Sequence, residues 1–288
     1  MALVSAVSGP QGVRVTDNQP AGTPIRLGLA LGGGAVRGAA HVGVLDVLDS
    51  AGLSPAVLTG TSAGALVGAL YAAGTSPSDI SKLAHTLRWA RLIRPARSRK
   101  ALFETARLGV FLDGVLGARH FDALSRPFAA VACDLTTGRE VVLRDGPVAT
   151  AVLASAAIPG VFPPVERDGQ VLVDGSLVTM VPAALAREMG ADIVLAVDVS
   201  GPLPRRRPTT LLHILVAAST LQPGGLDRLA EEADLVLSPR VDEYAFWELS
   251  RIAEFEESGR VAAERALPLL RALIETATAR RAWQDSTG

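Results

Sequence analysis

The pentapeptide Gly60-Thr61-Ser62-Ala63-Gly64 constrains the fold of this chain more than any other feature. It follows the apolar run Ala56–Thr59, which predicts a strand, and precedes small residues that predict a helix ending near Gly74. A serine on a tight turn from strand to helix projects its hydroxyl out of the sheet, and the crowded, strained backbone needs glycines on both sides. The pattern therefore predicts an α/β protein in which Ser62 is a nucleophile at the N-terminus of a helix, where developing negative charge is favoured.

A second glycine-rich segment, Gly32-Gly33-Gly34-Ala35-Val36-Arg37-Gly38, also lies between a predicted strand and a predicted helix. Apolar residues alternate from Ile25 to Leu31, as in a strand, and recur at helical spacing from Val42 to Leu48. The segment has neither the G-x-G-x-x-G spacing of dinucleotide sites nor the Gly-Lys-Ser/Thr of phosphate loops. Its consecutive amides predict an oxyanion hole, for which two N–H donors near the nucleophile suffice.

Predicted strands and helices alternate over the rest of the chain. This alternation predicts an α/β fold of three layers (α/β/α) with a mostly parallel central sheet and C-terminal helices. One helix is expected to begin at Ser76-Pro77, because serine is a preferred N-cap and proline fits the first helical position. The other predicted elements are a hairpin of 129–132 and 140–143, strands at 171–173, 193–197 and 235–237, and a helical tail with Leu269, Leu270, Leu273, Ile274 and Ala277 on one face.

Composition divides the chain into three parts. Residues 1–24 are rich in Ser, Gly, Pro and Gln without any period and predict a disordered extension. Residues 25–200 carry the alternating pattern and form the predicted catalytic domain. Residues 201–288 form a helical C-terminal part that is expected to pack on the same domain. Hydrophobic residues make up 49% of the chain, which is enough for a sizeable core.

Charge and residue counts exclude several classes of function. Lys and Arg number 28 and Asp and Glu 29, and this balance argues against a nucleic-acid surface. One cysteine, Cys133, and four scattered histidines do not make a metal site, so we expect neither a metal nor another cofactor. The sequence has no unbroken apolar run of membrane-spanning length and no convincing secretory signal, so we expect a cytoplasmic protein.

Further along the chain, Asp174-Gly175-Ser176 directly follows the predicted strand 171–173. An aspartate at a strand end followed by glycine can point into a cleft above the sheet, although most Asp-Gly pairs are turns. Four motifs now stand in order: the glycine-rich segment, the G-T-S-A-G turn, the run Ala154–Pro164 (ASAAIPGVFPP) and the D-G-S triplet. In this order they resemble the patatin-like phospholipases, most closely the bacterial single-domain branch. The resemblance runs from about Ile25 to about Ser200.

The resemblance implies a Ser–Asp dyad that works without histidine. Ser62 matches the family's nucleophile and Asp174 its base. The amides of Gly33, Gly34 and Ala35 match the oxyanion hole. Arg37 falls at the family's basic position in that loop, and the other supporting positions are Gly38, Gly60, Gly64 and Gly175.

The activity that the resemblance implies is hydrolysis of acyl esters in phospholipids, lysophospholipids or other lipids, through an acyl-enzyme intermediate. A carboxylate is a poor base for a serine hydroxyl in water, and burial raises its pKa and its basicity. We therefore expect Asp174 to be buried and hydrogen-bonded to Ser62. Two positions depart from the family's pattern: Ala35 stands where a third glycine is usual, and Ser176 where Gly or Ala usually ends the aspartate motif.

Two other functions remain open. One is a weakly active or inactive lipid-binding or regulatory module on the same fold, which Ala35 would favour because alanine resists a positive φ. The other is a Ser-His-Asp α/β-hydrolase that uses Ser62, Asp174 or Asp198, and His213. His213 lies in an apolar run, which is more typical of a packed histidine. Three further polar residues are interpreted as structural: His41 beneath the glycine-rich segment, Asp134 in a turn, and Ser155.

The segment Arg88–Lys100 contains six positive charges and no acid, with Trp89, Leu92 and Ile93 interleaved. One interpretation is a solvated helix end that is broken by Pro95. The other is an interfacial segment whose cations meet anionic headgroups while its apolar side chains enter the acyl boundary. The second interpretation predicts a membrane-peripheral protein whose partner is its lipid or acyl-ester substrate.

Overall fold

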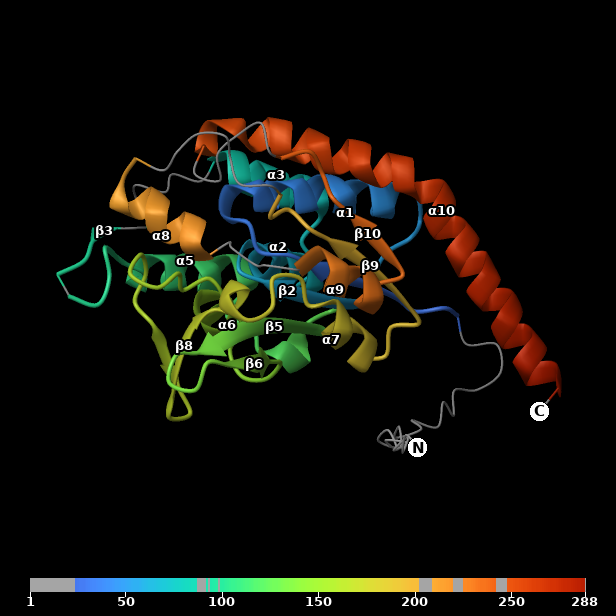
Figure 1. Ribbon diagram of the computed structural model, residues 1–288, viewed down its shortest axis with the longest axis horizontal. Helices are drawn as coiled ribbons and strands as arrows, with labels where there is room; N and C mark the ends of the chain where they lie inside the picture. The colour runs from blue at the N-terminus through green and yellow to red at the C-terminus, as the bar shows by residue number, and fades with distance from the viewer. Residues whose placement is uncertain are drawn as a thin grey trace, which may run out of the picture.

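The computed structural model describes residues 24–86, 92, 94–97, 99–201, 209–219, 225–241 and 248–287. Within these ranges a large sheet lies between helices on both of its faces (Figure 1). This arrangement confirms the predicted three-layer α/β/α fold with C-terminal helices. The predicted disordered extension, residues 1–24, lies outside the described residues apart from Pro24.

The large sheet is parallel in its greater part and antiparallel at one end. Its strands are β1 (Leu27–Leu31), β2 (Val57–Thr61), β5 (Phe128–Asp134), β6 (Arg139–Leu143), β7 (Val165–Arg167), β8 (Gln170–Asp174), β9 (Ile193–Val197) and β10 (Leu235–Leu237). In space they follow the order β10-β9-β1-β2-β5-β8-β7, with β6 also paired to β5. The strands from β10 to β5 are parallel, whereas β6, β7 and β8 pair antiparallel with their neighbours. A separate two-stranded sheet joins β3 (Arg94–Pro95) to β4 (Phe103–Glu104).

The helices divide between the two faces of the sheet. Two buried clusters define these faces: one joins the sheet to α1, α2, α6 and α10, and the other joins it to α7 and α9. The helices are α1 (Ala40–Ser50), α2 (Ala63–Ala72), α3 (Pro77–Thr86), α5 (Ala106–Leu116), α6 (Val148–Ser155), α7 (Ala183–Glu188), α8 (Leu211–Ser219), α9 (Gly225–Glu232) and α10 (Ile252–Thr287), with 3-10 turns η1 (Ala35–Ala39), η2 (Phe121–Ala123), η3 (Gly175–Leu177) and η4 (Leu249–Arg251). None of the helices in the described ranges combines the length and the apolar character that crossing a bilayer requires.

The alternation predicted in β1 separates the two layers. Leu29 and Leu31 are buried in the cluster that contains α1, α2 and α10. Ala30 faces the opposite cluster with the alanines of α7. A Cβ built on Gly28 would lie 2.5 Å from the Cβ of Ala191, so the turn that follows α7 packs directly on the backbone of β1. Large side chains on one face and very small ones on the other therefore let α7 lie close to the sheet.

Local signals for helix ends are confirmed. The amide of Asp79 donates to the Ser76 hydroxyl at 3.1 Å, as expected of an N-cap at the start of α3. Gly52 and Gly74 follow the C-termini of α1 and α2 with φ of +71° and +94°. These left-handed conformations suit glycine, which has no Cβ to crowd the preceding carbonyl.

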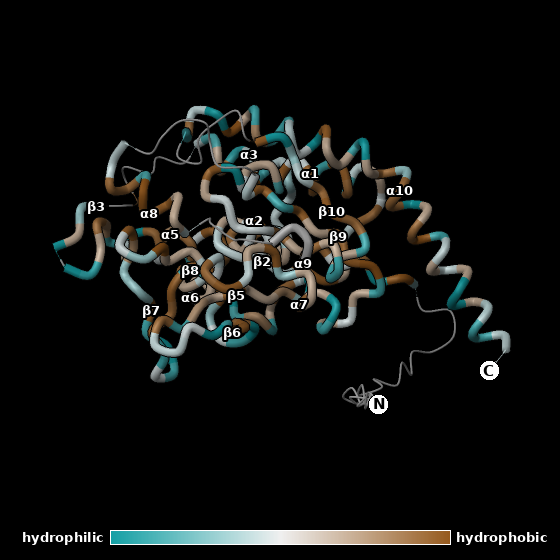
Figure 2. Tube along the Cα trace, viewed as in Figure 1, coloured by the Kyte–Doolittle hydropathy of each residue, from teal (hydrophilic) through white to brown (hydrophobic). Residues whose placement is uncertain are grey.

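The C-terminal part contributes strand β10, which pairs with β9 in the large sheet. Helix α10 runs along α1 and continues beyond the rest of the body (Figure 1), and hydrophilic and hydrophobic residues alternate along it (Figure 2). The predicted helical tail is confirmed, but Leu269 is 54% exposed and does not share the inner face. Leu270 is buried as predicted, and Leu273, Ile274 and Ala277 pack partly buried against the same cluster.

Glycines on both helices allow α1 and α10 to touch backbone to backbone. A Cβ built on Gly43 would overlap the carbonyl oxygen of Glu256, and a Cβ built on Gly259 would overlap the carbonyl oxygen of Ala40. Any larger residue at either position must push the two helices apart.

We expect Gly259→Ala to lower the free energy of unfolding by about 1–3 kcal/mol, because the added methyl group has no space between the helices. Urea unfolding followed by circular dichroism measures this loss. Gly114→Ala in α5 is the matched control: no atom lies within 4 Å of its built Cβ. That change should instead stabilise the helix by about 0.5–1 kcal/mol. Equal effects of the two substitutions would contradict this account of the contact.

Candidate active site

Two strands share one edge of β5, and their ends meet there. Thr61, the last residue of β2, pairs with Val131. Asp174, the last residue of β8, pairs with Ala132, the next residue of β5. Strand β6 occupies the opposite edge of β5 over this stretch. Strand β8 therefore pairs along the same edge of β5 as β2, and its pairing begins where that of β2 ends. The residue after β2, Ser62, is therefore brought next to Asp174.

Ser62 stands on the turn from β2 into α2 with φ 53° and ψ −117°. This conformation is strained for a residue with a side chain, and such strain is common at functional turns. A Cβ built on Gly64 would overlap the carbonyl oxygen of Leu31, and one on Gly60 would lie 2.6 Å from the amide nitrogen of Ala65. Neither position has space for a side chain, because other backbone atoms pass so close. This agrees with the tight strand-to-helix turn predicted at Ser62, which is called a nucleophile elbow.

The Ser62 hydroxyl donates a hydrogen bond to Asp174 Oδ2 at 2.7 Å. The hydrogen bond expected from the sequence is therefore present, and both residues are buried, with 6% and 1% of their surface exposed. Burial raises the pKa of Asp174, and hydrogen bonds from Ser176 and Ser62 oppose that rise. A carboxylate with a raised pKa is a stronger base than one in water, so the Asp174 carboxylate is chemically suited to accept the proton of the Ser62 hydroxyl.

The glycine-rich segment offers two amides rather than the predicted three. The amide of Gly33 donates to the carbonyl oxygen of Met180 at 3.0 Å, so it is already engaged and the prediction for this donor is not supported. Gly34 precedes η1 and Ala35 begins it, where helical amides have no partner in their own turn. Neither amide has an acceptor in the described part of the chain. Ala35 lines the same cavity as Ser62.

Ala35 adopts the left-handed conformation that alanine resists, with φ 50°. The departure from the family's glycine therefore does not prevent the turn, although an L-residue with a side chain there costs about 1–2 kcal/mol. The loop is fixed against α2, since a Cβ on Gly38 would lie 2.5 Å from the Cβ of Ala63.

Two buried side chains support the loop. His41 lies beneath it, as interpreted from the sequence, and its Nε2–H donates to the carbonyl oxygen of Gly32 at 2.8 Å. Burial lowers the pKa of His41 to about 4, so the imidazole is neutral at neutral pH. The Arg37 guanidinium is 1% exposed and donates to the carbonyl oxygen of Ser200 at 2.5 Å. Arg37 thus ties the loop to the segment that follows β9.

Ser155 has a closer role at the site than its sequence context suggested. Its hydroxyl accepts the amide of Ser62 at 2.9 Å and donates to the carbonyl oxygen of Val131 at 2.6 Å. It therefore joins the elbow to β5 directly behind the nucleophile. Gly175 packs against the same carbonyl of Val131, and a Cβ built on Gly175 would overlap its oxygen. The sequence signal for Ser155 was its place in the run that carries the family resemblance, and not any local spacing.

The other candidate residues lie outside the hydrogen-bonded pair of Ser62 and Asp174. Asp134 and Asp198 accept hydrogen bonds from the backbone amides two residues ahead, within their own turns. His213 in α8 lines the cavity, and its Nδ1 lies 3.4 Å from the Thr209 hydroxyl. A Ser-His-Asp arrangement needs an imidazole between hydroxyl and carboxylate, but the oxygens of Ser62 and Asp174 are 2.7 Å apart and leave no space for it.

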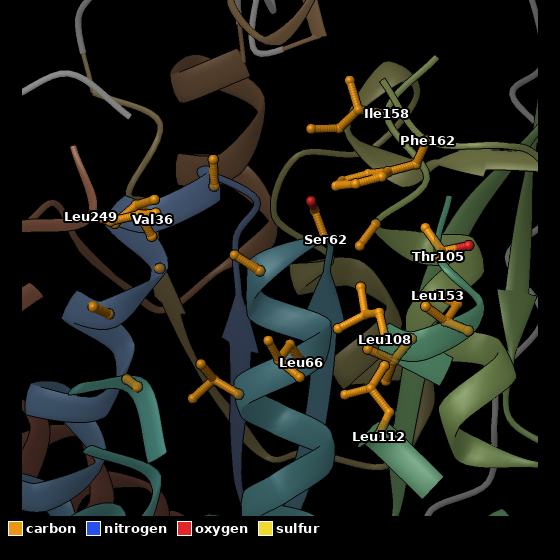
Figure 3. A pocket seen from close by; sticks show the side chains of 18 of the residues that line it. Val36, Ser62, Leu66, Thr105, Leu108, Leu112, Leu153, Ile158, Phe162 and Leu249 are labelled. Atoms are coloured by element: carbon orange, nitrogen blue, oxygen red, sulfur yellow. The ribbon is translucent and has the colours of Figure 1, made fainter. Parts of the chain in front are cut away.

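A cavity of about 360 Å³ opens at Ser62 and is lined almost entirely by apolar side chains. Figure 3 shows Ser62 at the start of α2, Leu66 one turn further along this helix, and Leu108 and Leu112 opposite them on α5. The cavity follows α2 as far as Leu70, and eight residues at 1.5 Å each give a length of about 12 Å. Its polar lining side chains are Ser62, Thr105 and His213.

The basic segment Arg88–Lys100 is described only in part. Residues 87–91, 93 and 98, which include Arg88, Trp89, Arg91 and Ile93, lie outside the described residues. Its described cations, Arg94, Arg97, Arg99 and Lys100, are exposed. Contact between this segment and a lipid surface stays a prediction.

The chain matches known proteins over more than half of its length. Residues 29–187, more than half of the chain, match a family model described as patatin-like phospholipase. An uncharacterized NTE family protein of Mycobacterium tuberculosis is 35% identical over 185 residues, which cover 61% of this chain and 49% of the relative. Human patatin-like phospholipase domain-containing protein 6 is 33% identical over 183 residues, which cover 60% of this chain and 13% of that protein. The chain thus spans about half or less of the curated relatives it matches.

A solved structure shares the fold. The crystal structure of VipD from Legionella pneumophila superposes with a TM-score of 0.64 over 85% of this chain and 67% of that chain. The two sequences are 13% identical over this match. At this identity the likeness concerns the arrangement of helices and strands.

We expect Ser155→Ala to lower the free energy of unfolding by about 1–3 kcal/mol, because it leaves the buried amide of Ser62 and carbonyl of Val131 without this partner. Urea unfolding measures the loss. Ser219→Ala is the control, since the hydroxyl of this serine, which is also buried, donates to the Val216 carbonyl within its own helix. The control should change stability by less than about 1 kcal/mol. Similar losses in both variants would argue against a special role for Ser155.

Proposed function

Because the chain belongs to the patatin-like phospholipase family, we propose that it hydrolyses the acyl esters of lipids, with Ser62 as nucleophile and Asp174 as base. One observation carries this proposal: the hydroxyl of Ser62 donates to Asp174 at 2.7 Å where an apolar cavity begins. A nucleophile, its base and a binding site for an apolar group are thus together. No histidine, metal or cofactor is needed for the steps that follow.

In the proposed reaction, Ser62 Oγ attacks the ester carbonyl carbon while its proton passes to Asp174 Oδ2. The carbonyl oxygen takes the negative charge and accepts hydrogen bonds from the amides of Gly34 and Ala35. When the tetrahedral intermediate collapses, the ester C–O bond breaks and the leaving alcohol takes the proton from Asp174. Asp174 then removes a proton from water, which attacks the acyl-enzyme, and the carboxylic acid leaves as Ser62 regains its proton.

The cavity supports an acyl chain as the group bound beside the nucleophile. An apolar lining of leucine, valine and phenylalanine side chains gains free energy by removing methylene groups from water, about 0.8 kcal/mol for each. It offers a charged or zwitterionic head group few polar partners. We therefore propose that the acyl chain lies along α2 and that the alcohol part of the ester stays outside.

A weakly active lipid-binding module remains the alternative, since the same cavity would hold a lipid without cleaving it. The departure that favoured this alternative was Ala35. Its left-handed conformation and its amide without an acceptor in the described residues support a working loop instead. The two functions differ in whether Ser62 reacts.

We expect a fluorophosphonate probe to label the intact protein, and Ser62→Ala to abolish that labelling. Asp174→Asn should lower turnover of a lipid ester by about 10²-fold or more, because no base then accepts the serine proton. His213→Gln should leave turnover within about twofold, since its imidazole has no part in the steps of proton transfer. Unlabelled parent protein that still binds lipid would favour the binding module. A large loss in His213→Gln would favour the histidine triad.

We also expect kcat/KM for simple acyl esters to rise with chain length from acetyl to octanoyl, by up to about fourfold per methylene group. Leu66→Trp should remove this dependence, because the indole blocks the cavity one turn from Ser62, while acetyl esters should be cleaved nearly as before. Val110→Trp on the outer face of α5, where Val110 is 74% exposed, is the control and should keep the parent's profile. Loss of acetyl and octanoyl activity in equal proportion would contradict this placement of the chain.

A further inference from the structure

Two serine hydroxyls bind the carboxylate of Asp174, one on each oxygen. Ser62 donates to Oδ2 at 2.7 Å. The hydroxyl of Ser176 donates to Oδ1, and the amide of Ser176 donates to the same oxygen at 2.9 Å. Ser176 belongs to η3 directly after β8 and is 4% exposed, so these contacts are shielded from solvent.

These hydrogen bonds stabilise the negative charge of the Asp174 carboxylate. A buried carboxylate needs donors or a cation, because removal from water disfavours the ionised form. Burial raises the pKa of Asp174, and the Ser176 hydroxyl is the largest of the three influences that lower it, before the Ser176 amide and the Ser62 hydroxyl. No charged side chain in the described part of the chain acts on this carboxylate.

The titratable groups on the neighbouring elements are engaged elsewhere. On β5 these are Cys133, whose thiol faces the carbonyl of Asp134, and Asp134, which is bound within its own turn. Beneath the glycine-rich segment, His41 bonds to Gly32 and Arg37 bonds to Ser200. The neighbouring ends of α2 and α6 bring only the hydroxyl groups of Ser62 and Ser155 to this region.

We propose that Ser176 is a positioning residue that keeps Asp174 ionised and turns its Oδ2 toward Ser62, so that Ser176 sets the lower pH limit of the reaction. This inference rests on the proposed function. Because Oδ1 accepts two hydrogen bonds from Ser176, the carboxylate of Asp174 is held against rotation, and its Oδ2 faces the Ser62 hydroxyl. Loss of the hydroxyl keeps the amide donor but removes one hydrogen bond that favours the ionised form.

The direction in which loss of the Ser176 hydroxyl moves the pH–rate profile follows from its hydrogen bond to the ionised form of Asp174. Without the Ser176 hydroxyl the ionised form is less stable, so the pKa of Asp174 rises and the base becomes protonated at a higher pH. The acid side of the pH–rate profile should therefore move upward by about one pH unit, since a hydrogen bond to a charged group corresponds to about one to two pKa units. A merely structural role would lower the rate at every pH and leave the midpoint in place.

The pH dependence of kcat/KM for an acyl ester, measured in Ser176→Ala and Ser176→Cys, tests the proposal. We expect an upward shift of the acid midpoint in the alanine variant and a smaller one in the cysteine variant, whose thiol is a weak donor. Ser54→Ala is the matched control, because this serine donates to Asp49 at 2.8 Å on the surface. Its profile should match the parent's. An unchanged midpoint in Ser176→Ala would overturn the proposal.

A second measurement does not depend on catalysis. Infrared difference spectroscopy follows the titration of the Asp174 carboxyl in full-length protein, with Asp174→Asn identifying the band. Ser176→Ala should raise this midpoint by the same amount as it moves the rate profile. If the parent protein neither reacts with fluorophosphonate nor cleaves esters, the proposed function fails and so does the role of Ser176 in the reaction. If the parent is active but the carboxyl midpoint does not move, Ser176 alone is refuted.

Discussion

The backbone of β5 at Val131 and Ala132 is the constraint on which the site depends. Thr61 and Asp174 pair with these two consecutive residues, the Ser155 hydroxyl donates to the Val131 carbonyl, and Gly175 lies against the same carbonyl. One strand thus fixes the proposed nucleophile Ser62, its proposed base Asp174 and the supporting Ser155 against two consecutive residues. Groups held this rigidly need little further ordering before they react, which is the main advantage of a preorganised site.

The costs of this arrangement are local, and the core offsets them. Ser62 and Ala35 both hold positive φ angles, and Asp174 is a carboxylate removed from water. Because the folded protein binds the Asp174 proton more tightly than the unfolded chain, this group lowers the free energy of unfolding as pH rises above the ordinary carboxyl range. Such costs persist where the surrounding structure over-determines them, here by a mostly parallel sheet packed on both faces.

Local patterns predicted much of this protein, and contacts between distant segments explain what they did not predict. The elbow at Ser62 and the cap at Ser76 follow from neighbouring residues, and the hydrogen bond from Ser62 to Asp174 followed from the family resemblance. The engagement of the Gly33 amide by Met180 and the bond from Ser155 to the elbow join residues that lie far apart along the chain. Neither has a local signature, because the first joins the segment after β1 to the segment after η3 and the second joins the turn after β2 to α6.

The pairing of β9 with β1 means that the stretch with the family's sequence signature does not contain every strand that completes its sheet. That stretch ends at residue 187, whereas β9 begins at Ile193 and shields one whole edge of the strand leading into the glycine-rich segment. Helix α10 sits on Ala40 from a still later part of the chain. A fragment trimmed to the recognisable stretch would expose a row of bare backbone amides and carbonyls, and it would be prone to aggregate before its chemistry could be judged.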